Sequence, residues 1–148
     1  MEIDFALNLF SSAQTARTIG TKYQNRSGGR KVMVVDDDVD FRLVLRHRFE
    51  EMGIKCFEAE NGEVAKSQLK KIHVDLVITD YRMPKMDGLE LIEWLQQTQR
   101  YVPIIFVSGD LSLPIRKKAE QVGVYAILEK PCSLSELSSK VEELFNGF

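Results

Sequence analysis

The sequence predicts an α/β fold of the doubly wound class, in which a five-stranded parallel sheet carries helices on both faces. Short apolar segments alternate with segments of helical periodicity five times between residues 31 and 148, and the connections between them are short. Such alternation requires parallel strands joined by right-handed crossovers. The composition agrees, because 44% hydrophobic and 28% charged residues are typical of a globular domain with its own core.

The five predicted strands are short and rich in β-branched residues, which pack well on a pleated sheet. The segment ending at Thr79 has an unbroken apolar run, as expected of a strand that is buried on both faces. The segment PIIFV is very apolar and is predicted to be central. The strands are predicted at residues 31–36, 54–59, 74–79, 103–107 and 125–128.

Five predicted helices follow the strands and carry recognisable end signals. Gly53 and Gly123 follow two of them, Pro114 lies in a first turn, and the sequence from Ser133 to Glu136 has the spacing of a capping box. The first helix has an apolar stripe predicted to face the core, made of Phe41, Val44, Leu45 and Phe49. The helices are predicted at residues 40–52, 61–72, 88–97, 112–122 and 133–145.

Residues 1–30 differ from the rest and are predicted to be an extension with a linker. Ile3, Leu7 and Phe10 recur at helical spacing, and Gly20 would end such a helix. Residues 21–30 are polar and Gly-rich, as linkers are. Two interpretations stay open, namely a frayed tail and a short helix that docks on this domain or on a partner.

Charge and cysteine content favour a cytoplasmic protein without a direct nucleic-acid or membrane partner. The net charge of -2 provides no basic footprint, and the acidic start lacks the basic region of a signal peptide. Cys56 and Cys132 show no metal-site spacing and are expected to be reduced thiols. His47 and His73 have no ligand-forming neighbours at suitable spacing, so we expect surface positions.

Polar residues collect where the predicted strands end, which is the edge at which open α/β sheets bind ligands. If the first and third strands are neighbours, several carboxylates converge there and repel one another unless a cation is present. A hard divalent ion with oxygen ligands, Mg²⁺, is the natural partner. The residues at this edge are Asp36, Asp37 and Asp38, then Asp80, then Ser108, Gly109 and Asp110, and finally Glu129, Lys130 and Pro131.

These groups together describe a site for phosphoryl transfer onto an aspartate. Asp38 and Asp40 could cap the following helix, which leaves Asp36 and Asp37 for the metal. A lysine and a hydroxyl on the far strands suit an anion with dispersed charge. Each signal is weak alone, but all four strand ends contribute to the same pattern.

Four segments at the strand ends form a recognisable pattern. They are VVDDD at 34–38, DLVITDYRMPKMDGLEL at 75–91, VSG at 107–109 and EKP at 129–131, and the longest is the most specific. With them, residues 31–148 resemble a response-regulator receiver domain of the chemotaxis-regulator type, and residues 1–30 lie outside the resemblance. The resemblance implies a flavodoxin-like sheet in the order 2-1-3-4-5.

The resemblance implies that Asp80 accepts a phosphoryl group from the phosphohistidine of a partner kinase. It makes Asp37 and Asp80 direct Mg²⁺ ligands, with the main-chain carbonyl of Arg82 as a third protein ligand. Asp36 would act through water. The sequence from Asp80 to Arg82 carries this part of the motif intact.

The resemblance also implies how the phosphoryl group is held and reported. Ser108 would move its hydroxyl onto the phosphoryl group, Gly109 would leave room, and Lys130 would pair with phosphate oxygens. The Lys130–Pro131 bond is expected to be cis. Partners would then read the surface formed by the last two helices and the fifth strand.

Two features depart from the usual pattern or extend it. Ile127 occupies a position that is usually aromatic, so coupling is expected to be weaker or to run through the backbone. Tyr125 lies two residues earlier and is expected on the same face. Arg82 and Asp110 flank the path of the hydrolytic water, and their opposite charges could pair across the phosphoryl group and slow its loss, or both could simply be solvated.

The sequence favours a switch over an enzyme that turns over an external substrate. A stand-alone switch fits a chain that ends soon after the last helix, and a phosphorelay intermediate that hands its phosphate to a histidine phosphotransfer protein is the alternative. An aspartate-based phosphohydrolase is disfavoured because Asp80-Tyr81-Arg82 has no second acid. A fragment of a larger regulator or hybrid kinase stays open. The expected partners are a histidine kinase, a downstream target and a second, phosphorylated copy.

Overall fold

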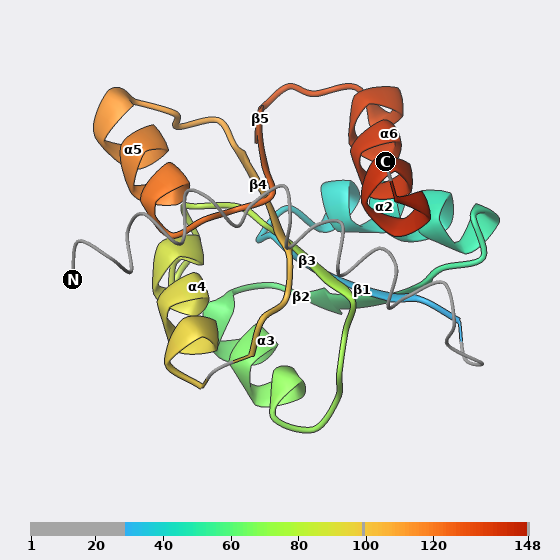
Figure 1. Cartoon of the computed structure of the whole chain (residues 1–148), viewed down its shortest axis with the longest axis horizontal. Coiled ribbons are helices and arrows are strands. Elements are labelled where there is room, and N and C mark those ends of the chain that lie inside the picture. Colours follow the sequence, from blue (N-terminus) through green and yellow to red (C-terminus); the bar gives the residue numbers. More distant parts are fainter. Residues whose placement is uncertain (1–28, 99, 148) are drawn as a thin grey trace.

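The computed structural model describes residues 29–98 and 100–147, which form one parallel sheet in the order β2-β1-β3-β4-β5 (Figure 1). The predicted fold class and strand order are confirmed. Residues 1–28, where a short helix and most of a linker are expected, lie outside the described residues, so the division at residue 30 stays a prediction. The strands are β1 (Lys31–Val35), β2 (Lys55–Ala59), β3 (Leu76–Thr79), β4 (Ile104–Ser108) and β5 (Ala126–Glu129).

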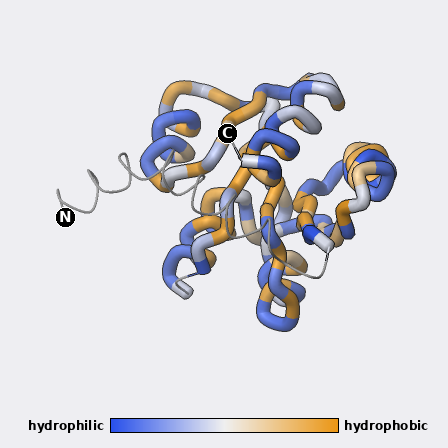
Figure 2. Tube along the Cα trace, turned by 45° about the vertical axis from the view of Figure 1, so that its right-hand side comes forward, coloured by the Kyte–Doolittle hydropathy of each residue, from blue (hydrophilic) through white to orange (hydrophobic). Residues whose placement is uncertain are grey.

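Helices cover both faces of the sheet, α2 and α6 on one face and α3, α4 and α5 on the other (Figure 1). Along the helices, hydrophobic and hydrophilic residues alternate, as expected of elements that are half buried (Figure 2). No helix among the described residues is long and apolar enough to cross a membrane. The helices are α2 (Val39–Glu51), α3 (Gly62–Leu69), α4 (Gly88–Gln97), α5 (Leu113–Gln121) and α6 (Leu134–Asn146).

Strand alternation divides the core into two clusters, one on each face of the sheet. In β1, Val32 and Val34 face the α2–α6 cluster, which also contains Leu45, Phe49, Leu137 and Val141. Met33 and Val35 face the α3–α5 cluster, which also contains Ala65, Leu91, Phe106 and Ala119. All residues of β3 and β4 are buried, which confirms that these strands are central. Buried central strands place their carboxyl ends firmly in the middle of one sheet edge.

The helix starts are fixed by short polar side chains that accept main-chain hydrogen bonds. The Asp38 side chain accepts from the N–H groups of Asp40 and Phe41 and so caps α2. Asp87 and Glu90 form a capping box at the start of α4. Ser133 accepts from the Glu136 N–H at 3.0 Å, at the position that the sequence predicts. Since Asp38 is used as a cap, the two preceding aspartates stay available for other contacts.

The predicted apolar stripe of the first helix is wrong at Val44. Leu45 and Phe49 are buried as expected, but Val44 is 51% exposed. Successive helical residues point about 100° apart, so a stripe centred on Leu45 and Phe49 leaves the preceding residue at its edge. Val44 therefore lines an open groove between α2 and the start of α6.

The expectation that Tyr125 shares a face with Ile127 is also wrong. Strand β5 begins at Ala126, so strand alternation does not extend back to Tyr125. Tyr125 packs against the α2–α6 cluster, and its hydroxyl donates to Glu143 Oε2 at 2.7 Å, whereas Ile127 packs on the opposite face. Burial and this carboxylate raise the pKa of Tyr125. Tyr125 thus links β5 to α6.

Two substitutions on α2 test the corrected packing. Phe49→Ala should lower the free energy of unfolding by about 3–5 kcal/mol, because a fully buried aromatic ring is removed. Val44→Ala should change it by no more than about 0.5 kcal/mol, because the side chain is largely solvated. Urea denaturation measures both, and similar losses in the two variants would contradict the packing described here.

Candidate functional site

The candidate site lies at the carboxyl edge of the sheet, where β1, β3, β4 and β5 end. Asp36 directly follows β1, and its N–H donates to the carbonyl of Ala59 at 3.0 Å. Asp80 directly follows β3, and its N–H donates to the carbonyl of Val35 at 3.0 Å. Because β1 and β3 are paired neighbours, these backbone bonds place both aspartates side by side.

Three predicted metal ligands come together there. Asp36, Asp37 and Asp80 each offer a carboxylate oxygen, and these oxygens lie within 4.8 Å of one another. Asp36 is buried, Asp80 is half-buried and Asp37 is exposed. A cluster of carboxylate oxygens that is open to solvent on one side matches the ligand preference of Mg²⁺, which keeps several waters. The donor set therefore fits this ion; the Arg82 carbonyl stays a predicted ligand.

Lys130 lies against the same carboxylates. Its Nζ donates to Asp36 Oδ2 at 2.6 Å and to Asp80 Oδ2 at 3.2 Å. Burial acts to lower the pKa of Lys130, but the hydrogen bond to Asp36 and the two carboxylate charges outweigh it and leave this pKa above its ordinary value. Burial also raises the pKa of Asp36, against the opposing effect of Lys130. The lysine is therefore a firmly held cation beside both acids.

The side chain of Asp80 is held from both sides. The Tyr81 N–H donates to Asp80 Oδ1 at 2.7 Å, while Lys130 binds the other oxygen. The Thr79 hydroxyl donates to the Asp80 carbonyl at 2.9 Å. The following loop returns to the same place, because the Gly88 N–H donates to the Tyr81 carbonyl at 2.9 Å. A Cβ on Gly88 would overlap the Asp80 carbonyl oxygen, so this close approach requires glycine.

Ser108 and Gly109 lie at the end of β4, beside Lys130. Ser108 is buried, and its Oγ accepts from the Asp110 N–H at 3.1 Å. The Lys130 N–H donates to the Ser108 carbonyl at 2.9 Å, which joins the ends of β4 and β5. A Cβ on Gly109 would meet only the Lys130 Cβ, at 4.0 Å, so space is present there. The Lys130–Pro131 bond is cis, as predicted.

Arg82 and Asp110 form the ion pair that the sequence suggests. Arg82 Nε donates to Asp110 Oδ2 at 2.8 Å, and Arg82 holds the pKa of Asp110 below its ordinary value. The Arg82 side chain is 77% exposed and that of Asp110 is 25% exposed, so the pair is open to solvent mainly at its arginine. An open depression beside it is lined by Asp37, Tyr81, Arg82, Met83, Pro84 and Asp87.

Sequence reasoning missed two residues of this site. Lys130 Nζ lies 4.6 Å from the centre of the Phe41 ring, which is a cation–π contact. The sequence pattern alone indicates only that Phe41 is an apolar residue on the core-facing stripe of a helix. Arg42 Nη1 donates to the Asp36 carbonyl at 2.6 Å. Nothing in the sequence pattern signals either contact, because both depend on how α2 is placed over the ends of β1 and β5.

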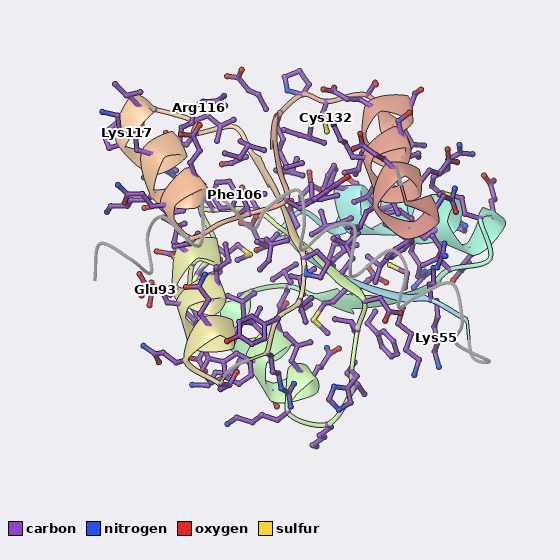
Figure 3. The ribbon with its side chains drawn as sticks, viewed as in Figure 1. Lys55, Glu93, Phe106, Arg116, Lys117 and Cys132 are labelled. Atoms are coloured by element: carbon purple, nitrogen blue, oxygen red, sulfur yellow. The ribbon has the colours of Figure 1, made fainter. Side chains whose placement is uncertain are left out.

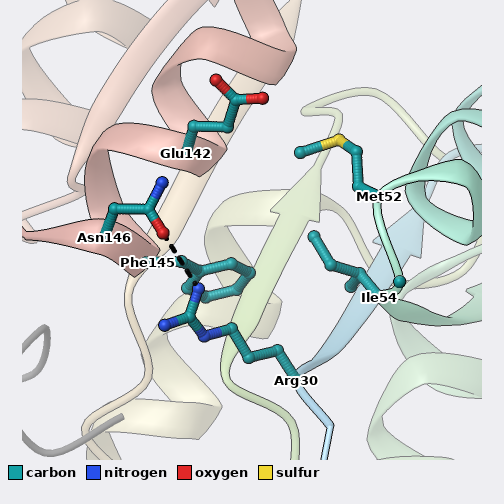
Figure 4. A pocket seen from close by; sticks show the side chains of 7 residues that line it. Arg30, Met52, Ile54, Glu142, Phe145 and Asn146 are labelled. Atoms are coloured by element: carbon teal, nitrogen blue, oxygen red, sulfur yellow. Dashed lines mark hydrogen bonds between the residues drawn. The ribbon is translucent and has the colours of Figure 1, made fainter. Parts of the chain in front are cut away.

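The remaining predicted groups lie away from the site or play no visible part in it. His47 and His73 are exposed, and Cys56 and Cys132 are free thiols, as expected. A separate hollow of about 380 Å³ lies at the opposite edge of the sheet, between Arg30, Ile54 and Phe145 (Figure 4). There Arg30 donates to Asn146 Oδ1 at 3.4 Å and lies over the Phe145 ring. The lining of this hollow includes one acid, Glu142, so it lacks an acidic cluster like that of the candidate site.

Comparisons with known proteins agree with this geometry. A family model described as response regulator receiver domain matches residues 32–142. The chain is 33% identical over 138 residues to the cyclic di-GMP phosphodiesterase response regulator RpfG of Xanthomonas campestris, covering 90% of this chain but only 36% of that protein. It is 26% identical to sporulation initiation phosphotransferase F of Bacillus subtilis, covering 76% of this chain and 91% of that one.

A solved structure gives the same result in three dimensions. The response regulator TrrA from Thermotoga maritima, determined in complex with Mg²⁺ and BeF, superposes with a TM-score of 0.69 at 28% identity. The match covers 78% of this chain and 98% of that one. The similarity therefore spans the whole sheet and the edge that carries the acidic residues.

Two glycine substitutions test the packing around Asp80. Gly88→Ala should lower the free energy of unfolding by about 1–3 kcal/mol, because the new methyl group would push into the Asp80 carbonyl. Gly109→Ala should change it by no more than about 0.5 kcal/mol, because the space beside Lys130 is open. Thermal or urea unfolding measures both, and a tolerated alanine at residue 88 would refute the close approach.

Proposed function

The chain belongs to the response regulator receiver domain family, and we propose that it is a phosphorylation-activated switch that accepts a phosphoryl group from a histidine kinase onto Asp80. One observation carries the proposal. Asp36, Asp37 and Asp80 bring carboxylate oxygens within 4.8 Å of one another, and Lys130 Nζ lies 3.2 Å from Asp80 Oδ2 at the same sheet edge. The proposed nucleophile, the proposed metal ligands and a cation suited to bind phosphate thus lie close together, which supports this function.

In the proposed reaction, a carboxylate oxygen of Asp80 attacks the phosphorus atom of a phosphohistidine. The new P–O bond forms as the P–N bond breaks, and the bonding pair stays on the imidazole nitrogen of the donor. The product is a mixed anhydride, which water later hydrolyses to restore Asp80. The chain therefore carries the phosphoryl group temporarily and does not turn over an external substrate.

Mg²⁺ fits the acidic cluster as the cofactor of this transfer. Asp37 and Asp80 would hold it directly together with the main-chain carbonyl of Arg82, and Asp36 would act through water. When bound, the ion supplies positive charge against the phosphoryl oxygens. The structural relative solved with Mg²⁺ and BeF supports this assignment.

Lys130 and Ser108 would hold the phosphoryl group once it is attached. Phosphorylation adds roughly -1.5 to -2 charge beside Lys130, which already contacts Asp80 and can exchange a carboxylate for phosphate oxygens. The Ser108 hydroxyl would donate to the phosphoryl group, and Gly109 leaves the space that this movement needs. Since Lys130 is bonded to the Ser108 carbonyl, the movement would be transmitted to both strand ends.

The output surface is proposed to be α5, β5 and α6. Ile127 replaces the usual aromatic reporter, so coupling would run through the backbone between Ser108 and Lys130. Tyr125, through its hydrogen bond to Glu143, would pass a shift of β5 to α6. Arg116 and Lys117 project from α5 (Figure 3). We place the switch in the cytoplasm, with a downstream protein or a second phosphorylated copy as reader.

A phosphorelay intermediate is the second candidate function. The similarity to sporulation initiation phosphotransferase F favours it, since a phosphotransferase hands its phosphoryl group on. A relay benefits from a phosphoaspartate that resists water, and the Arg82–Asp110 pair would slow the approach of water if it lies across the phosphoryl group. In this role a histidine phosphotransfer protein would take the phosphoryl group from Asp80. A larger regulator containing this domain is compatible with either role.

Beryllofluoride tests the switch. Addition of beryllofluoride with Mg²⁺ should change the fluorescence of Trp94, which packs against the α3–α5 cluster, because the phosphoryl mimic alters the sheet edge. Asp80→Asn should abolish the change, since the mimic binds to the carboxylate. A response that is equal in Asp80→Asn, or that persists without Mg²⁺, would overturn the proposal.

The Arg82–Asp110 pair should slow the loss of the phosphoryl group. Arg82→Ala and Asp110→Ala should each speed hydrolysis about two- to five-fold, because loss of the exposed ion pair would admit water to the phosphoryl group. Lys85→Ala, in the same exposed loop, is the control and should leave the rate unchanged. Decay of the labelled protein measures all three, and unchanged decay in both pair variants would refute this role.

A further inference from the structure

Arg42 reaches from helix α2 back to the acidic loop that ends β1. Its Nη1 donates to the main-chain carbonyl of Asp36 at 2.6 Å. Asp36 is the residue that joins β1 to Asp37, so this carbonyl lies inside the segment that carries two of the clustered carboxylates. The Arg42 side chain is only 14% exposed, so solvent competes weakly for this bond.

Glu58 of β2 orients the guanidinium from the other side. Arg42 Nε donates to Glu58 Oε1 at 3.3 Å, and Arg46 Nη1 donates to Glu58 Oε2 at 2.8 Å. Glu58 is itself placed by its pairing with Val34 across the sheet and by Gln68, whose Nε2 donates to the Glu58 carbonyl at 2.9 Å. Arg42 is therefore held by β1, α2 and β2 together.

The acidic loop, residues 36–38, needs such a restraint because its neighbouring carboxylates repel one another. Asp36, Asp37 and Asp38 carry adjacent carboxylates, and Lys130 approaches only the side chain of Asp36 among them. The Asp38 N–H donates to Asp36 Oδ1 at 2.9 Å, which closes the loop on itself. A guanidinium on the Asp36 carbonyl adds both a charge-assisted hydrogen bond and a positive charge at the point from which the carboxylates diverge.

We propose that Arg42 is a positioning residue for the divalent-cation site. It fixes the Asp36 carbonyl, and through that bond it sets where the Asp36 and Asp37 carboxylates lie, while Glu58 keeps the guanidinium in place. The proposal rests on the proposed function in that the cation is Mg²⁺. Arg46 provides the comparison, because it binds the same glutamate from the same helix and the structure shows it on Glu58 and Glu50, away from the loop.

Arg42→Met and the matched variant Arg46→Met test the proposal. Each loses a guanidinium on Glu58, but only Arg42→Met frees the Asp36 carbonyl. In a Mg²⁺ titration followed by the NMR shifts of loop amides, Arg42→Met should weaken binding about tenfold, the effect of losing one hydrogen bond to a charged group. Arg46→Met should stay within about twofold of the wild type, the scale of an exposed ion pair.

Amide hydrogen exchange of Asp38 in metal-free protein gives a second, independent measurement. Exchange should be about tenfold faster in Arg42→Met, because the loop opens more often, and unchanged in Arg46→Met. Arg42→Lys keeps the positive charge, but its single amine cannot bind both the Asp36 carbonyl and Glu58, so this variant should behave like Arg42→Met. If Arg42→Met does not fold, Arg42→Lys takes its place in both measurements.

Equal effects of the Arg42 and Arg46 substitutions, or wild-type behaviour of Arg42→Lys in both measurements, would overturn the proposal. Mg²⁺ binding and the restraint of the loop by Arg42 are tested by separate measurements. A wild type that does not bind Mg²⁺ would refute the proposed function, whereas faster Asp38 exchange confined to the Arg42 variants would still establish the restraint on the loop.

Discussion

Repulsion among three carboxylates at one sheet edge is the constraint on which the site depends. Asp36 and Asp80 follow neighbouring central strands, and the backbone hydrogen bonds that pair those strands hold the main chains of the two residues side by side. The oxygens of Asp36, Asp37 and Asp80 stay within 4.8 Å of one another as a result. Such a cluster is unfavourable without positive charge, so the surrounding residues are best understood by how they supply it.

The positive charge that can offset these carboxylates comes from three sources. Lys130 contacts Asp36 and Asp80 directly from the end of β5, Arg42 contacts the Asp36 carbonyl from α2, and the open side near Asp37 is available to a divalent cation. Lys130 follows β5 and Arg42 lies in α2, so a change of charge at Asp80 would affect several elements together. A phosphoryl group would attract Lys130, and the bond between Lys130 and the Ser108 carbonyl would carry that pull into β4 and β5.

Local sequence patterns were enough to predict the strands and the starts of the helices, because both depend on interactions between residues close together in the chain. Apolar runs such as that before Asp80 predicted the buried strands, and turn and cap residues predicted where the helices begin. The strand order came only from the resemblance, because periodicity says nothing about which strands are neighbours. Val44 and Tyr125 were misplaced for different reasons: Val44 lies within α2 but at the edge of its apolar stripe, and Tyr125 precedes the first residue of β5.

The site was predictable where it follows strand ends and unpredictable where it depends on helix placement. Asp36, Asp37, Asp80 and Lys130 converge as expected because the ends of parallel strands share one edge, and Ser108 is joined to Lys130 through a backbone bond. Phe41 and Arg42 join the same site from α2, and only the packing of that helix reveals them. The contacts that α2 adds to the site are thus the part that needs three-dimensional information.

We propose Asp80 as the residue that becomes phosphorylated. Incubation with acetyl phosphate and Mg²⁺, followed by borohydride reduction and peptide mass spectrometry, tests it most directly, because reduction converts a phosphorylated aspartate into homoserine. We predict conversion at Asp80 alone, and only when Mg²⁺ is present. Conversion at another acid, or no conversion at Asp80, would contradict the assignment of Asp80 as the phosphoacceptor.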